Sequence, residues 1–431
     1  MDREKNLSNF LPNIFLHNKY SNLKQLTNNI KCDIAVIGGG MAGLTTAHEF
    51  ASRGLKVVLI EKYFCGAGAS GKSSGFITPD SEYSLADLIK KYGENDAKKI
   101  WNFATAGVEH IRNSIEKYGL KCDYMQQDTV IFANKQKDIS VIEKEHASRL
   151  KFGYDSSFYS KNKISKILNS SSYKAAVKYT GSFGINAYQY CQEMKNYLNS
   201  IGVLIFEDTP ALEIGDNYIK TPSGLLKAEY IILCVDKDTP ELNKLKHKIY
   251  HAQTFLALSA PLNDKQINKL FPQGPIMAWD TSLIYYYFRL TGEQRLMLGG
   301  ASIFHTYARK ASLDSTYMKD QLTKYAEKKF LDVDIDFNYM WPGLIGITKD
   351  FFPIGGFDKD QKNLYIIAGC AGLPWAAAMG IYCTQRIVDG YKEFDHYFDP
   401  YRKYPLGETI QKIIGTPLTF AISNFSILNS L

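Results

Sequence analysis

The sequence predicts an α/β fold in which a parallel central sheet is interleaved with a second, antiparallel α+β part. Two apolar, β-branched runs, 34–37 and 56–60, flank a helical pattern, and such uninterrupted runs are typical of strands buried on both faces of a parallel sheet. Similar runs recur later in the chain, at 203–206, 230–235 and 364–369. Residues 251–303 instead alternate apolar and polar side chains in short runs, which predicts antiparallel strands.

A glycine-rich turn, 38–43, joins the first strand to its helix. In this context Gly38 permits a tight turn, Gly40 lets a pyrophosphate approach the backbone, and Gly43 allows the helix to pack closely on the strand. The order of strand, glycines, helix and second strand is the fingerprint of a Rossmann-like dinucleotide-binding domain.

The residues around this turn are expected to bind a dinucleotide. Met41 and Ala42 lie at the helix start, where free N–H groups bind phosphate. Glu61 ends the second strand, at the position where a carboxylate accepts hydrogen bonds from the ribose hydroxyls of adenosine. Lys62 follows it and is included in the expected site. NAD and FAD both fit this part of the sequence.

A second loop of small residues, 65–76, follows directly. A nicotinamide enzyme would normally continue into another β-α unit at this point. A loop rich in N–H and hydroxyl groups suits a second contact along the longer FAD molecule, toward its ribitol and ring. The loop residues expected to bind the cofactor are Gly68, Ala69, Ser70, Ser73, Ser74 and Gly75.

At this loop the chain resembles the flavoprotein family that includes D-amino acid oxidase, glycine and sarcosine oxidases and the γ-glutamylputrescine oxidoreductases. The run 68–75, Gly-Ala-Ser-Gly-Lys-Ser-Ser-Gly, is similar to the Gly-Ala-Ser-Gly-Arg-Asn-Gly-Gly loop of the last group. Lys72, Ser73 and Ser74 depart from that pattern. The run 340–355 resembles the family's Trp-x-Gly…Thr-x-Asp-x-x-Pro-x-Gly pattern.

The resemblance implies a noncovalently bound FAD and a reaction in which the C–N bond of an amine or amino acid is oxidised. Hydride passes to flavin N5, water then hydrolyses the imine, and O2 or another acceptor takes the electrons. A quinone-linked amino acid dehydrogenase is one alternative. The other is an FAD-binding protein without turnover, a scaffold or sensor, which departures from the family pattern at 234–236 and 374–375 keep open.

Near the C-terminus, the last apolar strand ends at Gly369 and leads through Gly372 into a helix that starts at Leu373 and Pro374. The positive end of a helix dipole stabilises negative charge on a flavin ring. These four residues are therefore expected to bind the cofactor, and Trp375 beside them is a candidate catalytic residue.

Side chains alternate along the strand 283–290, so Tyr285, Tyr287 and Arg289 share one face. In amino-acid-oxidising members of the resembling family, an Arg and a Tyr from this sheet hold the substrate carboxylate, a task that suits a bidentate guanidinium. We therefore expect Arg289 to face the flavin with Tyr287 near it, both as catalytic residues. A structural ion pair of Arg289 at the domain junction is the alternative. No general base is singled out, because a substrate bound as the free amine does not strictly need one.

The order of these segments predicts two interleaved domains with an arm and a tail. The expected boundaries are 1–30 for an N-terminal arm, 31–110, 175–248 and 336–395 for the FAD-binding domain, 111–174 and 249–335 for the substrate domain, and 396–431 for a C-terminal tail. The uncharged end of the tail, 413–431, has one apolar helical face. This face predicts docking on the protein itself or on another subunit of a homo-oligomer, with peripheral membrane contact as the alternative.

Composition argues against several other classes of protein. Of 431 residues, 51 are basic and 44 acidic, which gives a net charge of +7, but no dense Lys/Arg block indicates nucleic-acid binding. The seven cysteines contain no Cys-x-x-Cys pair, which argues against a disulfide framework or a metal site. Since residues 1–30 contain no signal peptide, we expect a cytoplasmic protein with neither a metal nor a nucleic acid as partner.

Overall fold

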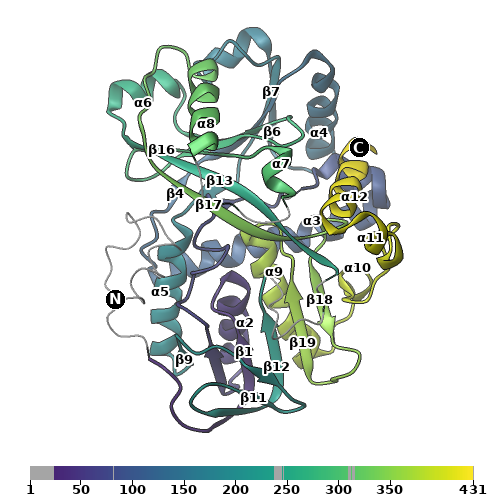
Figure 1. The fold of residues 1–431 in the computed structure, drawn as a ribbon. Coiled ribbons are helices and arrows are strands. Elements are labelled where there is room, and N and C mark those ends of the chain that lie inside the picture. Colours follow the sequence, from purple (N-terminus) through teal and green to yellow (C-terminus); the bar gives the residue numbers. More distant parts are fainter. Residues whose placement is uncertain are drawn as a thin grey trace.

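Two large sheets organise the chain in the computed structural model (Figure 1). The structure describes residues 24–80, 82–236, 245, 247–308, 312 and 316–430. Residues 1–23 of the predicted arm lie outside this set. In Figure 1 the first sheet forms the lower half and the second the upper half, and the long strands β13 (Ile249–Pro261) and β17 (Phe337–Thr348) cross between the two halves.

The first sheet contains the predicted parallel strands. Its members are β1 (Ile30–Ile37), β2 (Val57–Ile60), β9 (Leu204–Phe206), β10 (Glu213–Ile214), β11 (Tyr218–Lys220), β12 (Leu225–Cys234), β18 (Ile354–Phe357) and β19 (Leu364–Ala368). The neighbours β9-β2-β1-β12-β19 are all parallel, whereas β18 and the β10–β11 hairpin pair antiparallel at one side. β2 and β19 are buried along their whole length, as central parallel strands are. The predicted Rossmann-like sheet is therefore confirmed.

Helices pack closely against this sheet and against one another. They are α2 (Met41–Ser52), α3 (Leu85–Tyr118), α5 (Ala187–Ser200) and α9 (Leu373–Thr384), the last continued by a π-helical turn, η5 (Gln385–Asp389). A Cβ on Gly380 of α9 would lie 2.9 Å from the backbone nitrogen of Thr46 in α2, and one on Gly107 of α3 would lie 1.9 Å from the carbonyl oxygen of Pro374. Glycine at both contacts lets α9 pack closely against α2 and α3.

The second sheet has eight strands in the order β17-β13-β16-β15-β14-β5-β7-β6. Besides β13 and β17, they are β5 (Asp128–Ala133), β6 (Ser156–Ser160), β7 (Ala175–Tyr179), β14 (Ile276–Asp280), β15 (Tyr287–Leu290) and β16 (Arg295–Gly300). All pairs are antiparallel except β5 with β14. The helical segments of this half are η2 (Gln136–Asp138), α4 (Ile139–Lys151), η3 (Lys161–Lys166), α6 (Asp264–Leu270), α7 (Ile303–Thr306) and α8 (Thr316–Lys329).

Two predicted domain boundaries disagree with the strand pairing. The boundaries placed 175–179 and 337–348 in the FAD-binding domain, but β7 pairs with β5 and β6, and β17 pairs with β13. Both strands therefore belong to the second sheet. An apolar run such as Ala-Ala-Val-Lys-Tyr in β7 fits a buried position in either sheet, so the pattern alone does not assign it.

A small third sheet lies at the junction of the two halves. It contains β3 (Phe76–Ile77), β4 (Met125–Gln126) and β8 (Phe183–Gly184), with β8 pairing antiparallel to both others. β3 follows the small-residue loop directly. This pairing therefore anchors one end of the loop between the two large sheets.

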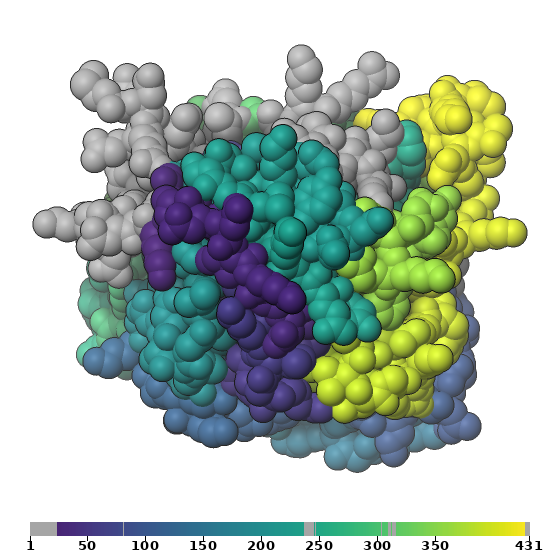
Figure 2. All heavy atoms as spheres, turned by 90° about the horizontal axis from the view of Figure 1, so that it is seen from below, coloured from purple at the N-terminus to yellow at the C-terminus, as the bar shows by residue number. Residues whose placement is uncertain are grey.

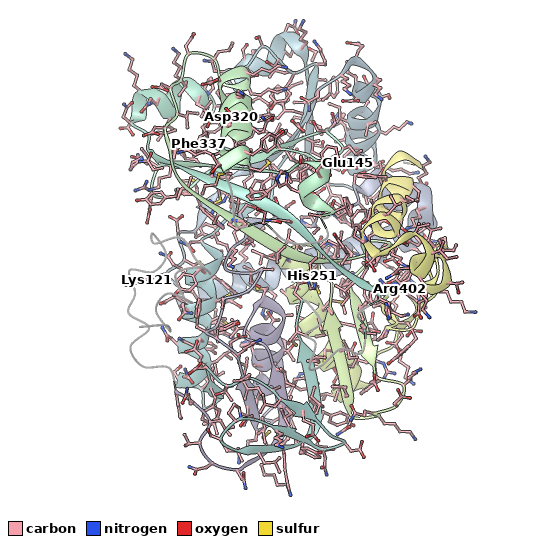
Figure 3. The ribbon with its side chains drawn as sticks, in the orientation of Figure 1. Lys121, Glu145, His251, Asp320, Phe337 and Arg402 are labelled. Carbon is pink, nitrogen blue, oxygen red and sulfur yellow. The ribbon has the colours of Figure 1, made fainter. Side chains whose placement is uncertain are left out.

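The predicted tail docks on its own chain. It forms α10 (Asp395–Phe398), α11 (Glu408–Ile414) and α12 (Thr416–Ser430), the yellow elements on the flank of Figure 1. Buried Asn424 of α12 donates to the carbonyl oxygens of Thr348 (3.1 Å) and Lys349 (3.0 Å). Arg402, labelled in Figure 3, donates to both carboxylate oxygens of Asp350 at 2.8 Å. Among the described residues, no helix has the length and apolar character needed to cross a membrane.

The described residues of the predicted arm, 24–29, contact β12 of the first sheet and the segment that follows β9. The backbone N–H of Leu26 donates to the Thr209 hydroxyl at 3.2 Å, and that of Leu225 donates to the Asn29 side chain at 2.8 Å. Figure 2 shows the purple N-terminal part of the described chain, to which these residues belong, on the face of the molecule beside teal segments. Residues 24–29 thus join the fold ahead of β1.

Candidate active site

One cavity of about 1540 Å³ lies between the two halves of the molecule. Its walls come from the turn after β1, the end of β2, the small-residue loop, the start of α9, and strands β13, β15 and β17 of the second sheet. Ordinary small-molecule pockets span roughly 300–1,000 Å³. The volume of this cavity therefore suits a long cofactor together with a substrate.

The glycine turn after β1 has no room for side chains. Gly38 adopts a φ of +110°, and a Cβ there would lie 2.4 Å from the carbonyl oxygen of Cys234. A Cβ on Gly43 would lie 1.8 Å from the carbonyl oxygen of Gly38. The turn and the start of α2 can pack this closely only with glycine at both positions. Gly43 therefore shapes the site without lining the cavity, whereas Gly38 and Gly40 line it.

The start of α2 opens into the cavity. Met41 and Ala42 both line it, and the first N–H groups of a helix have no partner within the helix. The N–H of Met41 donates to the hydroxyl of Ser70 at 2.9 Å. This bond ties the small-residue loop to the helix start, where the N–H groups favour a phosphate.

Glu61 has the position and spare capacity expected of a ribose ligand. Its carboxylate accepts the backbone N–H groups of Gly39 (2.7 Å) and Tyr63 (2.9 Å). Burial raises the pKa of Glu61, and these hydrogen bonds oppose that rise. An ionised carboxylate offers about four acceptor positions, so those two bonds leave room for ribose hydroxyls. Lys62 also lines the cavity beside it.

The small-residue loop lines the middle of the cavity along its length. The predicted residues that line it are Gly68, Ala69, Ser70, Ser73, Ser74 and Gly75, joined by Lys72. Gly75 has a φ of +71°, and a Cβ there would lie 1.8 Å from the carbonyl oxygen of Ile185. The indole N–H of Trp341 donates to the carbonyl oxygen of Lys72 at 3.1 Å. The second sheet thus holds the loop in place through its backbone.

The start of α9 forms the far end of the cavity. Gly372, with a φ of +116°, precedes the helix, and Gly372, Leu373 and Pro374 line the cavity. The helix is 12 residues long, so its positive end favours negative charge in the cavity. Gly369 turns the chain with a φ of +63° but does not line the cavity. Gly369 was predicted to bind the cofactor, but in the structure it serves as a turn residue.

Together these features fit FAD. Two helix starts, one small-residue loop and the Glu61 carboxylate line a single cavity. The positive ends of two helices suit a molecule that carries both phosphates and a ring that accumulates negative charge.

The structure does not support the predicted clamp role of Arg289. Its side chain is 1% exposed and does not line the cavity. The guanidinium donates to the carbonyl oxygens of Ser74 (2.6 Å), Ile185 (2.6 Å) and Leu290 (3.1 Å). Desolvation lowers the pKa of Arg289 to about 10. We expected Arg289 to face the flavin, but its guanidinium binds the backbone of the small-residue loop and does not reach the open cavity.

Trp375 also points away from the cavity. It is 4% exposed, and its indole N–H donates to the carbonyl oxygen of Pro79 at 3.3 Å. Its ring packs against Phe103 and Phe352, with centroids 5.8 and 5.9 Å away. Successive side chains of a helix point about 100° apart. Trp375 follows Pro374 in the first turn of α9, so its side chain points in a different direction and enters the hydrophobic core. Its predicted catalytic role is therefore corrected to a structural one.

Tyr287 does line the cavity. Its hydroxyl lies 3.1 Å from the hydroxyl oxygen of Thr254, and its ring meets Phe76 of β3 edge-on at 6.0 Å. Burial raises the pKa of Tyr287 to about 12, although the Thr254 hydrogen bond lowers it. The phenol is therefore neutral at physiological pH and can donate to a ligand.

Sequence reasoning missed two further polar groups of the cavity, Glu82 and Tyr307. Glu82 accepts a hydrogen bond from the Tyr285 hydroxyl at 3.1 Å, and Tyr307 donates to Asn424 at 3.0 Å. Glu82, Tyr285 and Tyr307 line the cavity, whereas Asn424 does not. The signal available for Glu82 was an acidic side chain shortly after the loop, while Tyr307 follows the last strand of the alternating region.

Three potential metal ligands converge outside this cavity. His48 Nδ1 and His110 Nδ1 lie 3.1 and 3.4 Å from the same oxygen of Glu49. His48 Nε2 lies 2.9 Å from the Tyr118 hydroxyl. His48 hydrogen-bonds Glu49 and Tyr118, and His110 lies within ion-pair distance of the same carboxylate, so we treat the group as a polar contact between α2 and α3.

Comparison with known proteins agrees with this geometry. Residues 33–386 match the family described as "FAD dependent oxidoreductase". The chain belongs to this family. It is 27% identical over 357 residues to a probable oxidoreductase OrdL of Haemophilus influenzae, covering 80% of each chain. It is 24% identical over 421 residues to γ-glutamylputrescine oxidoreductase of Escherichia coli, covering 91% of this chain and 92% of that protein.

Solved structures share the fold of this FAD-dependent oxidoreductase. Glycine oxidase from Geobacillus kaustophilus superposes with a TM-score of 0.74 at 17% identity, covering 87% of this chain and 99% of that one. L-proline dehydrogenase from P. horikoshii superposes with a TM-score of 0.73 at 19% identity, covering 87% and 98%. The family, the FAD cofactor and the enzymatic class predicted from the sequence are thereby confirmed.

Proposed function

We propose that this flavoenzyme oxidises the C–N bond of an amine or amino acid to an imine, which water then hydrolyses. The observation that carries the proposal is a single cavity shared by the FAD-binding elements and by a tyrosine-lined part of the second sheet. The relatives named γ-glutamylputrescine oxidoreductase and glycine oxidase support the choice of a nitrogen-containing substrate.

Bound FAD would supply the redox chemistry by accepting a hydride at N5 from the substrate carbon. The chain's own residues bind and orient the two reactants. The positive end of α9 favours negative charge at the end of the cavity where Gly372 lies. The phenol of Tyr287 offers a hydrogen bond beside the loop.

The proposal includes noncovalent FAD. Cys370 is the thiol nearest to the start of α9 that lines the cavity. Burial raises the pKa of Cys370 well above the ordinary value of a thiol, so the thiol stays protonated and is a poor nucleophile. No covalent link to the cofactor is therefore expected at this position.

A cytoplasmic location is also part of the proposal. All seven cysteines are free thiols, which is typical of a reducing compartment. Contact of the tail 413–431 with a second copy of the chain, or with a membrane surface, stays a prediction. Three apolar side chains on the outer face of α11 and α12 are exposed and could take part in either contact. They are Ile413, Leu418 and Ile422.

Reduction of bound flavin under anaerobic conditions tests the proposal. The purified protein is mixed with a panel of amines and amino acids while the visible absorbance of oxidised flavin is followed. We expect at least one member of the panel to bleach the flavin, and O2 or a quinone to restore the absorbance. A flavin that no member reduces would favour the scaffold or sensor alternative. The rate of recovery with O2 or with quinone separates an oxidase from a dehydrogenase.

A further inference from the structure

The charges that line the cavity do not suit a carboxylate-bearing ligand. Arg289 is engaged by backbone carbonyls, and among the described lining residues there is no arginine. The lining lysines belong to the FAD-binding loops or to the segment around η2; they are Lys62, Lys72, Lys135 and Lys137. In contrast, several carboxylates line the part of the cavity below the second sheet.

Most of these carboxylates are already satisfied by the protein. Asp80 accepts from Arg149 at 2.7 Å and from the Tyr179 hydroxyl at 2.6 Å. Glu145, labelled in Figure 3, accepts from Arg149 at 2.5 Å. Asp280 accepts from the hydroxyl of Tyr325 at 2.9 Å. These groups therefore have little capacity left for a ligand.

Glu82 differs from these carboxylates. The Tyr285 hydroxyl donates to one of its oxygens, and no Lys, Arg or His of the described residues forms an ion pair with it. Its side chain is half-buried and lines the cavity. Glu82 is thus a cavity carboxylate with an open position for a donor and, within the part of the chain that the structure describes, without an ion-pair partner.

Aromatic rings surround this carboxylate. Tyr285 and Tyr287 lie with ring centroids 5.9 Å apart, and both line the cavity with Tyr307. The charge of Glu82 contributes to raising the pKa of all three phenols, which reflects their proximity to it. A carboxylate among tyrosine faces is an environment that attracts an organic cation, through charge and through cation–π interaction.

We propose that Glu82, together with Tyr285, Tyr287 and Tyr307, binds a protonated amino group of the substrate. This inference rests on the proposed function and narrows its substrate class. A substrate with a carboxylate next to that amino group would bring like charge against Glu82, so an amine is favoured over an α-amino acid.

The cation held at Glu82 is an amino group other than the one oxidised. A carbon attached to a protonated nitrogen does not release hydride, so the reacting nitrogen must be uncharged. Tyr287 meets Phe76 directly after the loop, whereas Glu82 lies beside Tyr285, one ring further along. The geometry therefore suits a diamine, with one nitrogen near the loop and a second, charged nitrogen at Glu82.

Burial affects how Glu82 titrates. Desolvation raises its pKa, and the hydrogen bond from Tyr285 lowers it. A bound cation would favour the ionised carboxylate. Diamine affinity is therefore expected to increase as the pH rises through the pKa of Glu82, and to fall again where the amine itself loses its proton.

The test compares the holoenzyme with two isosteric variants, Glu82→Gln and Asp138→Asn. Asp138 also lines the cavity, and its Oδ2 accepts from both the Thr281 hydroxyl (2.5 Å) and the Lys135 N–H (3.0 Å). Binding of 1,4-diaminobutane, butylamine and butan-1-ol is followed through the flavin absorbance spectrum, which does not require turnover. The thermal midpoint and flavin content check that each variant is folded.

We expect the parent enzyme to bind 1,4-diaminobutane about tenfold or more tightly than butylamine, as for a hydrogen bond to a charged group. Glu82→Gln should remove this preference and leave butan-1-ol binding unchanged, whereas Asp138→Asn should retain it. Equal affinity for both amines in the parent, or an undiminished preference in Glu82→Gln, would overturn the proposal. If Glu82→Gln loses flavin, Glu82→Asp, which keeps the charge, is compared in its place and should retain the preference in weakened form.

The same samples separate this inference from the proposed function. A diamine preference without flavin reduction by any amine would support the Glu82 site and contradict the oxidation reaction. Flavin reduction without a preference for the diamine over butylamine would support the oxidation reaction and contradict the Glu82 site.

Discussion

The Arg289 guanidinium, on a strand of the second sheet, donates to the carbonyl oxygen of Ser74 in the small-residue loop over 2.6 Å. The two residues are 215 positions apart in the chain. The same guanidinium reaches Ile185, next to the small third sheet. A residue with the chemistry of a substrate clamp thus joins the loop to the second sheet.

Replacing Arg289 should therefore affect folding and flavin retention more than substrate affinity. Arg289→Lys keeps the charge but loses the planar fork, and a buried carbonyl left without its donor costs stability, so we expect a loss of about 2–4 kcal/mol. Thermal unfolding and flavin content measure this, with surface Arg53→Lys as the matched control; its side chain is 41% exposed. A stable, flavin-replete variant with a selectively raised KM for carboxylate substrates would restore the clamp role.

The glycine turn gives a steric prediction. Gly43→Ala would place a methyl group 1.8 Å from the carbonyl oxygen of Gly38, so we expect about 3 kcal/mol of destabilisation and loss of FAD. Gly407→Ala is the control, because a Cβ there meets nothing within 4 Å. Flavin fluorescence released on denaturation reports the bound cofactor. Full FAD occupancy in Gly43→Ala would show that the turn can relax.

Replacing Trp375 should leave the rate of substrate oxidation nearly unchanged. Trp375→Phe keeps most of the ring packing against Phe103 but loses the hydrogen bond to Pro79, so we expect about 1 kcal/mol of destabilisation. The rate of anaerobic flavin reduction by substrate should stay within a few-fold of the parent's. A large fall in that rate with unchanged thermal stability would return Trp375 to the catalytic residues.

The C-terminal helix should matter for the cavity through Asn424. Asn424→Ala leaves the Thr348 and Lys349 carbonyl oxygens and the Tyr307 hydroxyl without their partner, so we expect about 2–4 kcal/mol of destabilisation and weaker substrate binding. Asn199→Ala, on the exposed end of α5, is the control. Chemical denaturation and substrate titration measure the two effects. An Asn424→Ala protein as stable as its control would mean that α12 is dispensable.

The raised pKa of Glu82 predicts a pH-dependent cost to the substrate-free protein. A carboxyl whose pKa is higher in the folded state favours protonation there, so stability falls as the pH rises through that pKa. Glu82→Gln lacks this titration. Its thermal midpoint should therefore exceed that of the parent at neutral pH, and the difference should shrink toward acid pH. A difference that grows toward acid pH would give the opposite sign for the shift.

The first sheet could be predicted from the sequence because its determinants are local. Uninterrupted apolar runs and the glycine turn around Gly38 impose the same conformation in any buried α/β setting. The small-residue loop and the start of α9 could be predicted to line one cavity for a similar reason, since small residues and a helix start are local features of the sequence.

The substrate side could not be predicted in the same way because it depends on tertiary contacts. Alternation placed Arg289 and Tyr287 on one face correctly, but a long guanidinium can reach past its neighbours to a distant backbone. Glu82 meets Tyr285 across 203 positions in the chain, and no local pattern signals that contact. The predicted domain boundary at residue 175 disagrees with the pairing of β7 for a related reason, because burial alone does not say which sheet a strand joins.

The visible absorbance spectrum of the purified protein, before and after anaerobic addition of 1,4-diaminobutane, tests the central claim most directly. We predict an oxidised flavin spectrum that the diamine bleaches, with slower bleaching in Glu82→Gln than in Asp138→Asn. A protein that binds no flavin, or a bound flavin that neither amines nor amino acids reduce, would contradict the account.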